Sequence, residues 1–153
     1  MITKSALSRL RKEAMFDVVE LPYMDFFLQH DDPSFLVNRI LEMCHNCVNG
    51  PDQKKSTYVG AIRLAAISIM ILRGEKRNKT RIRRTLMDAF DFDIKEPAYR
   101  FLAAVQVQSY YTVKIMELCT AFNNLPPEQT QRDYQFSLLE LIIRVAAIAV
   151  LKQ

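Results

Sequence analysis

The chain has 153 residues, half of them hydrophobic and a quarter charged, which is ordinary for a globular protein that folds around one core without disulfides. It contains only three glycines and no tryptophan, and strands joined by tight turns usually need more glycine than this. We therefore predict an all-α fold, a compact single-domain bundle of about six helices that spans residues 1–153.

The first predicted helix covers about residues 5–20, because apolar residues recur there at spacings of three and four and Pro22 ends the pattern. Its start is basic, with Lys4, Arg9, Arg11 and Lys12. Residues 21–32 follow as an aromatic arm or a short helical turn. The second helix begins at Pro33, with Asp32 as its N-cap, and Gly50 stops it.

The third predicted helix, at about residues 57–73, is apolar around its whole circumference except at Arg63 and Ser68. Such a helix must be surrounded by others, so we expect it to be the buried central helix of the bundle. Three further helices are predicted: two at about residues 80–90 and 97–122, and a last one that opens within residues 123–129 and continues to residue 153.

Two apolar runs, at residues 58–72 and 138–151, contain charged residues and fall short of the about 20 apolar residues that a membrane span needs. We interpret both as buried core helices and predict no membrane span. The N-terminus is charged and has no apolar signal-peptide core. The odd number of cysteines, three, does not fit a disulfide framework, so we expect an intracellular location, cytoplasmic or nuclear.

Positive charge is concentrated between residues 73 and 84, which carry seven basic residues and one Glu. The net charge of this segment, +6, exceeds the +4 of the whole chain, so the protein is a near-neutral body with one basic segment. Lys and Arg bind phosphate by neutralising it and releasing counterions. The sequence therefore predicts a nucleic-acid or anion-binding site made of Arg73, Lys76, Arg77, Lys79, Arg81, Arg83 and Arg84.

The fourth predicted helix carries its charges in the order opposite to its dipole. Its first turn contains Arg81, Arg83 and Arg84, and Asp88 and Asp91 lie near its end. A helix dipole favours the reverse order, by about 0.3–1 kcal/mol for each charge. A bound anion at the N-terminus would offset this arrangement, because free N–H groups and guanidinium groups would both point at it. Arg81 and Arg84 should face solvent, opposite an apolar stripe of Ile82, Leu86 and Phe90.

Other interpretations of the basic segment stay open. A basic run is most often a solvated face, and an acidic protein surface or a nuclear-import receptor would use the same residues. Base stacking has weak support, because the nearest aromatic candidates, Tyr99, Tyr110 and Tyr111, are not interleaved with the basic run. A helix-turn-helix is disfavoured by the long loop between the third and fourth helices.

The motif CHNC at residues 44–47 suggests zinc, with His30, His45 and Cys119 as further candidate ligands. Zinc modules pair two such elements, and only one is present, so we predict buried cysteines, no metal and no cofactor. The chain has no Gly-rich phosphate loop and no nucleophile motif, and the carboxylates at 88, 91 and 93 do not fit a calcium loop. We therefore predict that it is not an enzyme.

The last predicted helix is too apolar to be left exposed, and the third already occupies the centre of the bundle. One face of it is therefore predicted to close a homodimer, unless the amphipathic helices of the same chain cover it. The residues of this predicted contact are Leu138, Leu141, Ile142, Val145 and Ile148.

The sequence supports two functions of different class. The first is a non-enzymatic nucleic-acid-binding helical module that contacts RNA or DNA phosphates, which by analogy would suit a viral, mobile-element or ribonucleoprotein accessory role. The second is a helical protein–protein interaction adaptor, in which the last helix or the aromatic arm docks a partner. In that case the basic loop is incidental or a nuclear-import signal.

Overall fold

The computed structural model describes residues 4–15, 32–49, 54–76, 79–92, 96–126 and 131–153. Within these ranges the chain forms seven α-helices and no strand, which confirms the predicted all-α bundle. They are α1 (Lys4–Met15), α3 (Pro33–Asn49), α4 (Lys54–Arg73), α5 (Lys79–Phe90), α6 (Pro97–Ala104), α7 (Gln108–Asn124) and α8 (Arg132–Leu151). Of the predicted aromatic arm at residues 21–32, only Asp32 lies within the described part of the chain.

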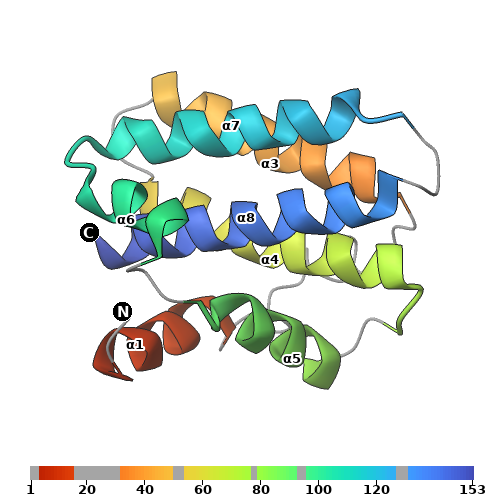
Figure 1. Cartoon of the computed structure of the whole chain (residues 1–153), viewed down its shortest axis with the longest axis horizontal. Helices are drawn as coiled ribbons and strands as arrows, with labels where there is room; N and C mark the ends of the chain where they lie inside the picture. The colour runs from red at the N-terminus through yellow and green to blue at the C-terminus, as the bar shows by residue number, and fades with distance from the viewer. Residues whose placement is uncertain (1–3, 16–31, 50–53, 77–78, 93–95, 127–130) are drawn as a thin grey trace.

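The helices are stacked in three layers (Figure 1). The middle layer consists of α4 and α8, which pack against each other over most of their lengths. On one side, α3 and α7 cover this pair, and on the other side it is covered by α1 and α5. The short helix α6 packs against α8 near the C-terminus.

The predicted central helix is the core of the bundle. Every residue of α4 from Ala61 to Met70 is buried, including Arg63 and Ser68. Ser68 Oγ donates a hydrogen bond to Leu64 O at 2.9 Å, so its hydroxyl is satisfied inside the helix. On the α3 side, the end of the flexible Met43 side chain lies against Gly60 and would have to move if this residue carried a Cβ.

The end of α4 is a Schellman turn. Gly74 adopts φ 67°, Glu75 N–H donates to Met70 O at 3.0 Å, and Gly74 N–H donates to Ile71 O at 3.0 Å. This confirms the helix end that the sequence predicts before Gly74. At the start of α3, Asp32 Oδ1 accepts a hydrogen bond from Ser34 N–H at 2.9 Å, which confirms Asp32 as the N-cap.

The prediction of one helix over residues 97–122 is wrong. The chain breaks between α6 and α7, where Val105 adopts φ −67° and ψ 132°. Two tyrosine hydroxyls donate to carbonyls at the break: Tyr111 Oη to Leu102 O at 2.6 Å, and Tyr58 Oη to Gln108 O at 3.0 Å. Tertiary contacts therefore stabilise a break where the sequence has neither glycine nor proline.

Basic side chains cap helices other than their own. Arg9 Nη2 in α1 donates to Val150 O in the last turn of α8 at 2.8 Å. Lys152 Nζ, just beyond α8, donates to Ala103 O near the end of α6 at 2.9 Å. Each places a positive charge at a helix C-terminus, where the dipole favours it.

The apolar residues of α8 are covered largely by helices of the same chain. Ile142 and Val145 are 0% exposed and Ile148 is 1% exposed, so these three side chains of the predicted dimer contact are not available to a partner. Leu138 and Leu141 are partly buried. The reason is that α4 and α7, together with α5 and α1, pack against the apolar residues of α8, which is the alternative that the sequence left open. Dimerisation itself stays a prediction.

By length and composition alone, residues 55–73 and the whole of α8 could each cross a membrane. Core helices of soluble proteins show the same pattern. Of the apolar stretch, 72% is buried inside the bundle in α4, as in a core helix, and 50% is buried in α8.

Candidate anion-binding site

The predicted basic segment joins the end of α4 to the first turns of α5, beside the layer formed by α1 and α5 (Figure 1). Arg73 is the last residue of α4, and Lys76 is exposed just beyond it. Arg77 lies outside the described residues, and for Lys79 the structure places only the backbone, as the first residue of α5.

Two of the predicted site residues have partners within the chain. The guanidinium of Arg73 lies 5.6 Å from the centre of the Phe136 ring in α8, a cation–π distance. Arg81 Nη1 lies 3.7 Å from Glu75 Oε2, and both side chains are partly exposed. Exposed pairs of this kind contribute about 0–1 kcal/mol to stability.

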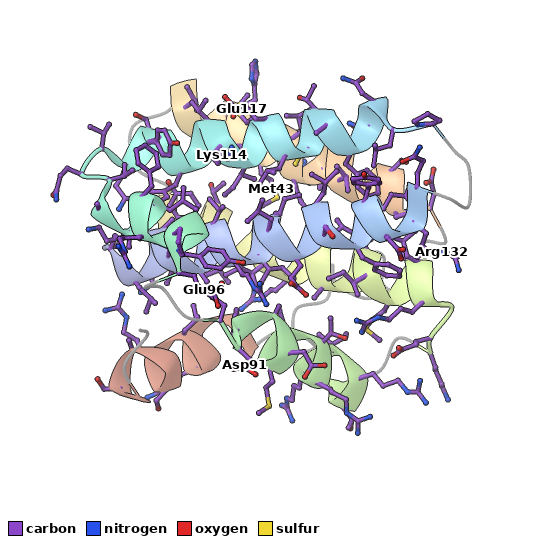
Figure 2. All side chains as sticks on the ribbon, viewed as in Figure 1. Met43, Asp91, Glu96, Lys114, Glu117 and Arg132 are labelled. Atoms are coloured by element: carbon purple, nitrogen blue, oxygen red, sulfur yellow. The ribbon has the colours of Figure 1, made fainter. Side chains whose placement is uncertain are left out.

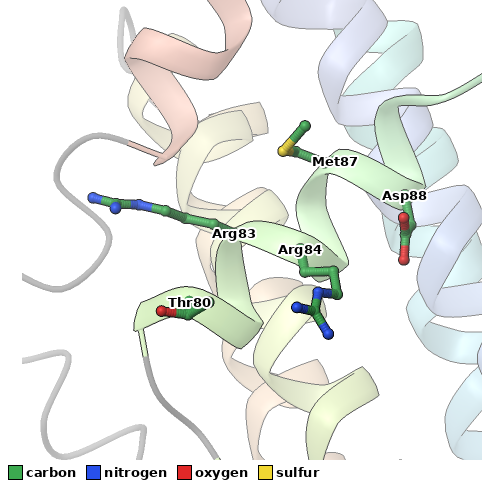
Figure 3. Close-up of a pocket in the computed structure, with 5 residues that line it drawn as sticks. All are labelled: Thr80, Arg83, Arg84, Met87 and Asp88. Atoms are coloured by element: carbon green, nitrogen blue, oxygen red, sulfur yellow. The ribbon is translucent and has the colours of Figure 1, made fainter.

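Arg83 and Arg84 are the exposed cations at the centre of the site. Together with Thr80, Met87 and Asp88 they line an open hollow of about 430 Å³ on the outer surface of α5. Neither arginine takes part in an ion pair or hydrogen bond within the part of the chain that the structure describes. In Figure 3 their guanidinium groups extend to different sides of the helix. They are therefore arranged to reach two separate anions rather than to clasp one.

The orientation of α5 agrees with the prediction. Its apolar stripe packs against α4 and α8, Arg81 and Arg84 are exposed on the opposite side, and Arg83 is exposed at the flank of the stripe. The buried residues of the stripe are Ile82, Leu86 and Phe90, at 0%, 0% and 3% exposure. The side chains that could bind an anion are thus on the outer surface of the bundle.

The unfavourable interaction between the charges of α5 and its helix dipole is smaller than the sequence indicates. Arg144 Nε in α8 donates a hydrogen bond to Ala89 O, in the last turn of α5, at 2.9 Å. A cation from a different helix therefore occupies the C-terminus of α5, where the dipole favours it. At the other end, the carboxylate of Glu75 lies close to the first turn through its contact with Arg81. A bound anion is consequently not needed to offset the charges of this helix.

Arg144 is a residue whose role the sequence did not reveal. Its Nη1 donates to Tyr99 Oη at 2.6 Å and pairs with Glu140 Oε1 at 3.1 Å. Its guanidinium also lies 5.2 Å from the Phe92 ring centre and 5.6 Å from that of Tyr99. One feature of the sequence could have indicated this role. Arg144 lies inside the apolar run of α8, and an arginine in such a position requires hydrogen-bond acceptors nearby.

Comparison with known proteins gives no match. No protein-family model, no curated protein and no solved structure is significantly similar to the chain. Every statement on function therefore rests on the residues and the geometry of this chain alone.

The three cysteines lie in the core of the bundle. Cys44, Cys47 and Cys119 are buried where α3 and α7 pack together, whereas His45 is exposed. Burial raises the pKa of Cys44 and of Cys119 to about 12, so both thiols are protonated at neutral pH. Within the described ranges no three His, Cys, Asp or Glu side chains are grouped to hold a metal ion. His30 lies outside those ranges.

The aromatic candidates for base stacking are mostly buried. Tyr99 is 7% exposed and Tyr111 is 0% exposed, and both hydroxyls take part in hydrogen bonds within the bundle. Only Tyr110 is partly exposed, and its ring lies edge-on to Phe101, with centres 5.8 Å apart. None of these rings belongs to α5, so the candidate site has charge without a stacking platform.

Proposed function

We propose that the chain is a non-enzymatic nucleic-acid-binding module that contacts the phosphate backbone of RNA or DNA. One observation carries this proposal: Arg83 and Arg84 are exposed, and neither has an acidic partner among the described residues. Cations that stabilise a fold usually have a carboxylate or carbonyl acceptor, as Arg144 does in this bundle.

The form of the site supports contacts to the backbone rather than to bases. The hollow on α5 is open and shallow, and the side chains that line it are two arginines, a hydroxyl, a methionine and one carboxylate. Phosphate contacts from Arg and Thr fix the position of a protein on nucleic acid but carry no sequence information. Binding is therefore expected to be independent of sequence and strongly dependent on salt.

The proposal can be tested by filter binding of mixed RNA and DNA at several salt concentrations. The logarithm of the affinity should fall linearly with the logarithm of the salt concentration, by about 0.9 for each duplex DNA phosphate neutralised. The double variant Arg83→Glu/Arg84→Glu should abolish binding, because it replaces two phosphate ligands with like charges.

A matched control comes from the opposite layer of the bundle. Arg39 in α3 is exposed and pairs with Glu42 at 3.2 Å, and the variant Arg39→Glu should bind as the wild type does. If the wild type does not bind any nucleic acid at low salt, the proposed function is wrong. Equal losses in the control and in the double variant would also reject it, because only overall charge would then matter.

A protein-interaction adaptor is the second candidate. The observation that favours it is an exposed apolar corner at the break between α6 and α7, where Phe101 is 64% exposed and Val107 is 63% exposed. Apolar side chains that gather at a surface often mark a protein contact. Light scattering distinguishes the homodimeric form of this candidate, because a monomer has a mass of 17.8 kDa.

A further inference from the structure

Positive charge is gathered in one outer layer of the bundle, and the layer contains more than the predicted basic segment. α1 and α5 contact each other, and both cover the same side of the α4–α8 pair (Figure 1). Each of the two helices has four basic residues and one acidic residue in its sequence, a net charge of +3. The two helices together therefore carry more positive charge than the whole chain, whose net charge is +4.

The opposite layer is neutral. The sequences of α3 and α7 each contain one basic and one acidic residue, and each forms an ion pair within its own helix. The distances are 3.2 Å for Arg39–Glu42 and 3.8 Å for Lys114–Glu117; Figure 2 labels the second pair. The α1–α5 layer therefore carries a net positive charge, whereas the charges of the α3–α7 layer are balanced by ion pairs within each helix.

The orientation of α1 places part of its charge on the outer surface. Leu10 is 0% exposed and points into the core, and Arg9 is anchored by its hydrogen bond to Val150 O. Ser8 and Lys12 are both exposed, and residues four apart lie on the same helical face. Lys12 has no partner among the described residues, so α1 presents a solvated cation and a hydroxyl on the same side of the molecule as α5.

We propose that α1 and α5 together form one phosphate-binding face, and that its ligand is double-stranded nucleic acid. This inference rests on the proposed function and extends it from one segment to a two-helix surface. Each helix has 12 residues and is about 18 Å long, so the face is broader than a single phosphate needs. The diverging guanidinium groups of Arg83 and Arg84 suit separate phosphates on such a broad ligand.

The ligand is assigned as a duplex because the described residues of α1 and α5 offer charge and hydroxyls but no exposed ring. Single strands are usually bound by stacking bases on aromatic side chains. Within the described parts of α1 and α5 the single aromatic residue is Phe90, which is 3% exposed. The large exposed aromatic residues of the described ranges, Phe35, Phe101 and Tyr134, belong to α3, α6 and α8.

The test is a fluorescence-anisotropy titration of the full chain with a DNA duplex, an RNA duplex of the same sequence, and one single strand of each. The variants are Lys12→Gln in α1 and Arg84→Gln in α5, with Lys114→Gln in α7 as the matched control. Each of the first two should reduce the salt slope by about 1 and weaken duplex binding about tenfold at 50 mM salt, whereas the control should change neither. Both duplexes should bind more tightly than the single strands.

Different results separate this inference from the proposed function. If Arg84→Gln weakens binding and Lys12→Gln does not, α1 is not part of the face, although the proposed function stands. A second variant, Ser8→Glu, places a negative charge on the same exposed face of α1 and should weaken binding as Lys12→Gln does. Single strands that bind as tightly as duplexes would overturn the duplex assignment alone. No binding by the wild type would overturn both proposals.

Discussion

Polar groups on the mainly apolar helices of this bundle bond to specific backbone carbonyls. Ser68 Oγ donates to Leu64 O, Tyr111 Oη to Leu102 O, and Arg144 Nε to Ala89 O. An unsatisfied buried group of this kind costs about 1–3 kcal/mol, so each side chain must be placed together with its acceptor. The buried thiols do not need such an acceptor, because a protonated thiol is only a weak hydrogen-bond donor.

Alkaline pH should destabilise the protein through Cys44 and Cys119. Burial raises the pKa of both thiols from the ordinary value of 9.0 to about 12, so the folded state holds these protons more tightly than the unfolded state. The stability that they contribute is fully present below about pH 9 and is lost as pH rises toward 12. Urea unfolding at a series of pH values should show this fall.

The double variant Cys44→Ala/Cys119→Ala provides the comparison for the alkaline experiment. Its free energy of unfolding should decrease less steeply above pH 9 than that of the wild type. Tyr58, whose pKa burial also raises to about 12, should account for part of the decrease that remains. The expectation fails if the two curves have the same slope.

Three different kinds of local structure end or begin the helices of this chain. Asp32 caps α3 through its side chain, Gly74 ends α4 through its positive φ, and tyrosine hydroxyls bond the carbonyls between α6 and α7. The first two kinds are local in sequence, and the third depends on distant contacts. The break is therefore the boundary that depends most on the packing of the bundle.

Replacing Tyr111 with Phe should weaken the junction between α6 and α7. Tyr111→Phe removes the donor to Leu102 O while keeping the buried ring, and the free energy of unfolding should fall by about 1–2 kcal/mol. Tyr110→Phe is the control, because Tyr110 is partly exposed and its change should stay within about 0.5 kcal/mol. Equal effects in urea unfolding would show that the hydroxyl of Tyr111 does not stabilise the break.

The limits of sequence-based prediction are clearest at the level of the helices. The apolar circumference of α4 and the stripe of α5 predicted their burial, because helix period and exposure are local properties. The break at Val105 was not predictable, because Tyr58, which bonds Gln108 O, lies 50 residues away in the sequence. Likewise, the Arg144 that caps α5 lies 55 residues beyond its acceptor.

At the scale of the whole molecule, Arg144 joins the α1–α5 layer to the middle of the bundle. It lies in α8, bonds α5 through Ala89 O and bonds α6 through Tyr99, and its side chain is 16% exposed. α5, the helix that carries the candidate site, is therefore anchored at its C-terminal end by a residue of the middle layer. The sequence predicted the arginines of the site, but this support became visible only in the packed structure.

Removing Arg144 should destabilise the protein without touching the binding face. Arg144→Ala loses a charged hydrogen bond to the backbone and two ring contacts, and we expect a loss of about 2–4 kcal/mol in the free energy of unfolding. Arg144→Lys keeps the positive charge but not the planar guanidinium group, so its loss of unfolding free energy should be smaller than that of Arg144→Ala. The exposed Arg39→Ala serves as control, with an expected loss of at most about 1 kcal/mol. If Arg144→Ala also lost at most about 1 kcal/mol, Arg144 would not be an important link between α8 and the helices α5 and α6.

The hydrogen bond from Arg9 to Val150 also bears on the order in which the protein assembles. The two residues are 141 positions apart, so α1 cannot complete this contact until residues as far as Val150 have been synthesised. Closing so long a loop carries a large entropic cost, and such contacts tend to form late in folding. The surface that α1 and α5 share would then be completed late in folding, once α8 has taken its place beside α1.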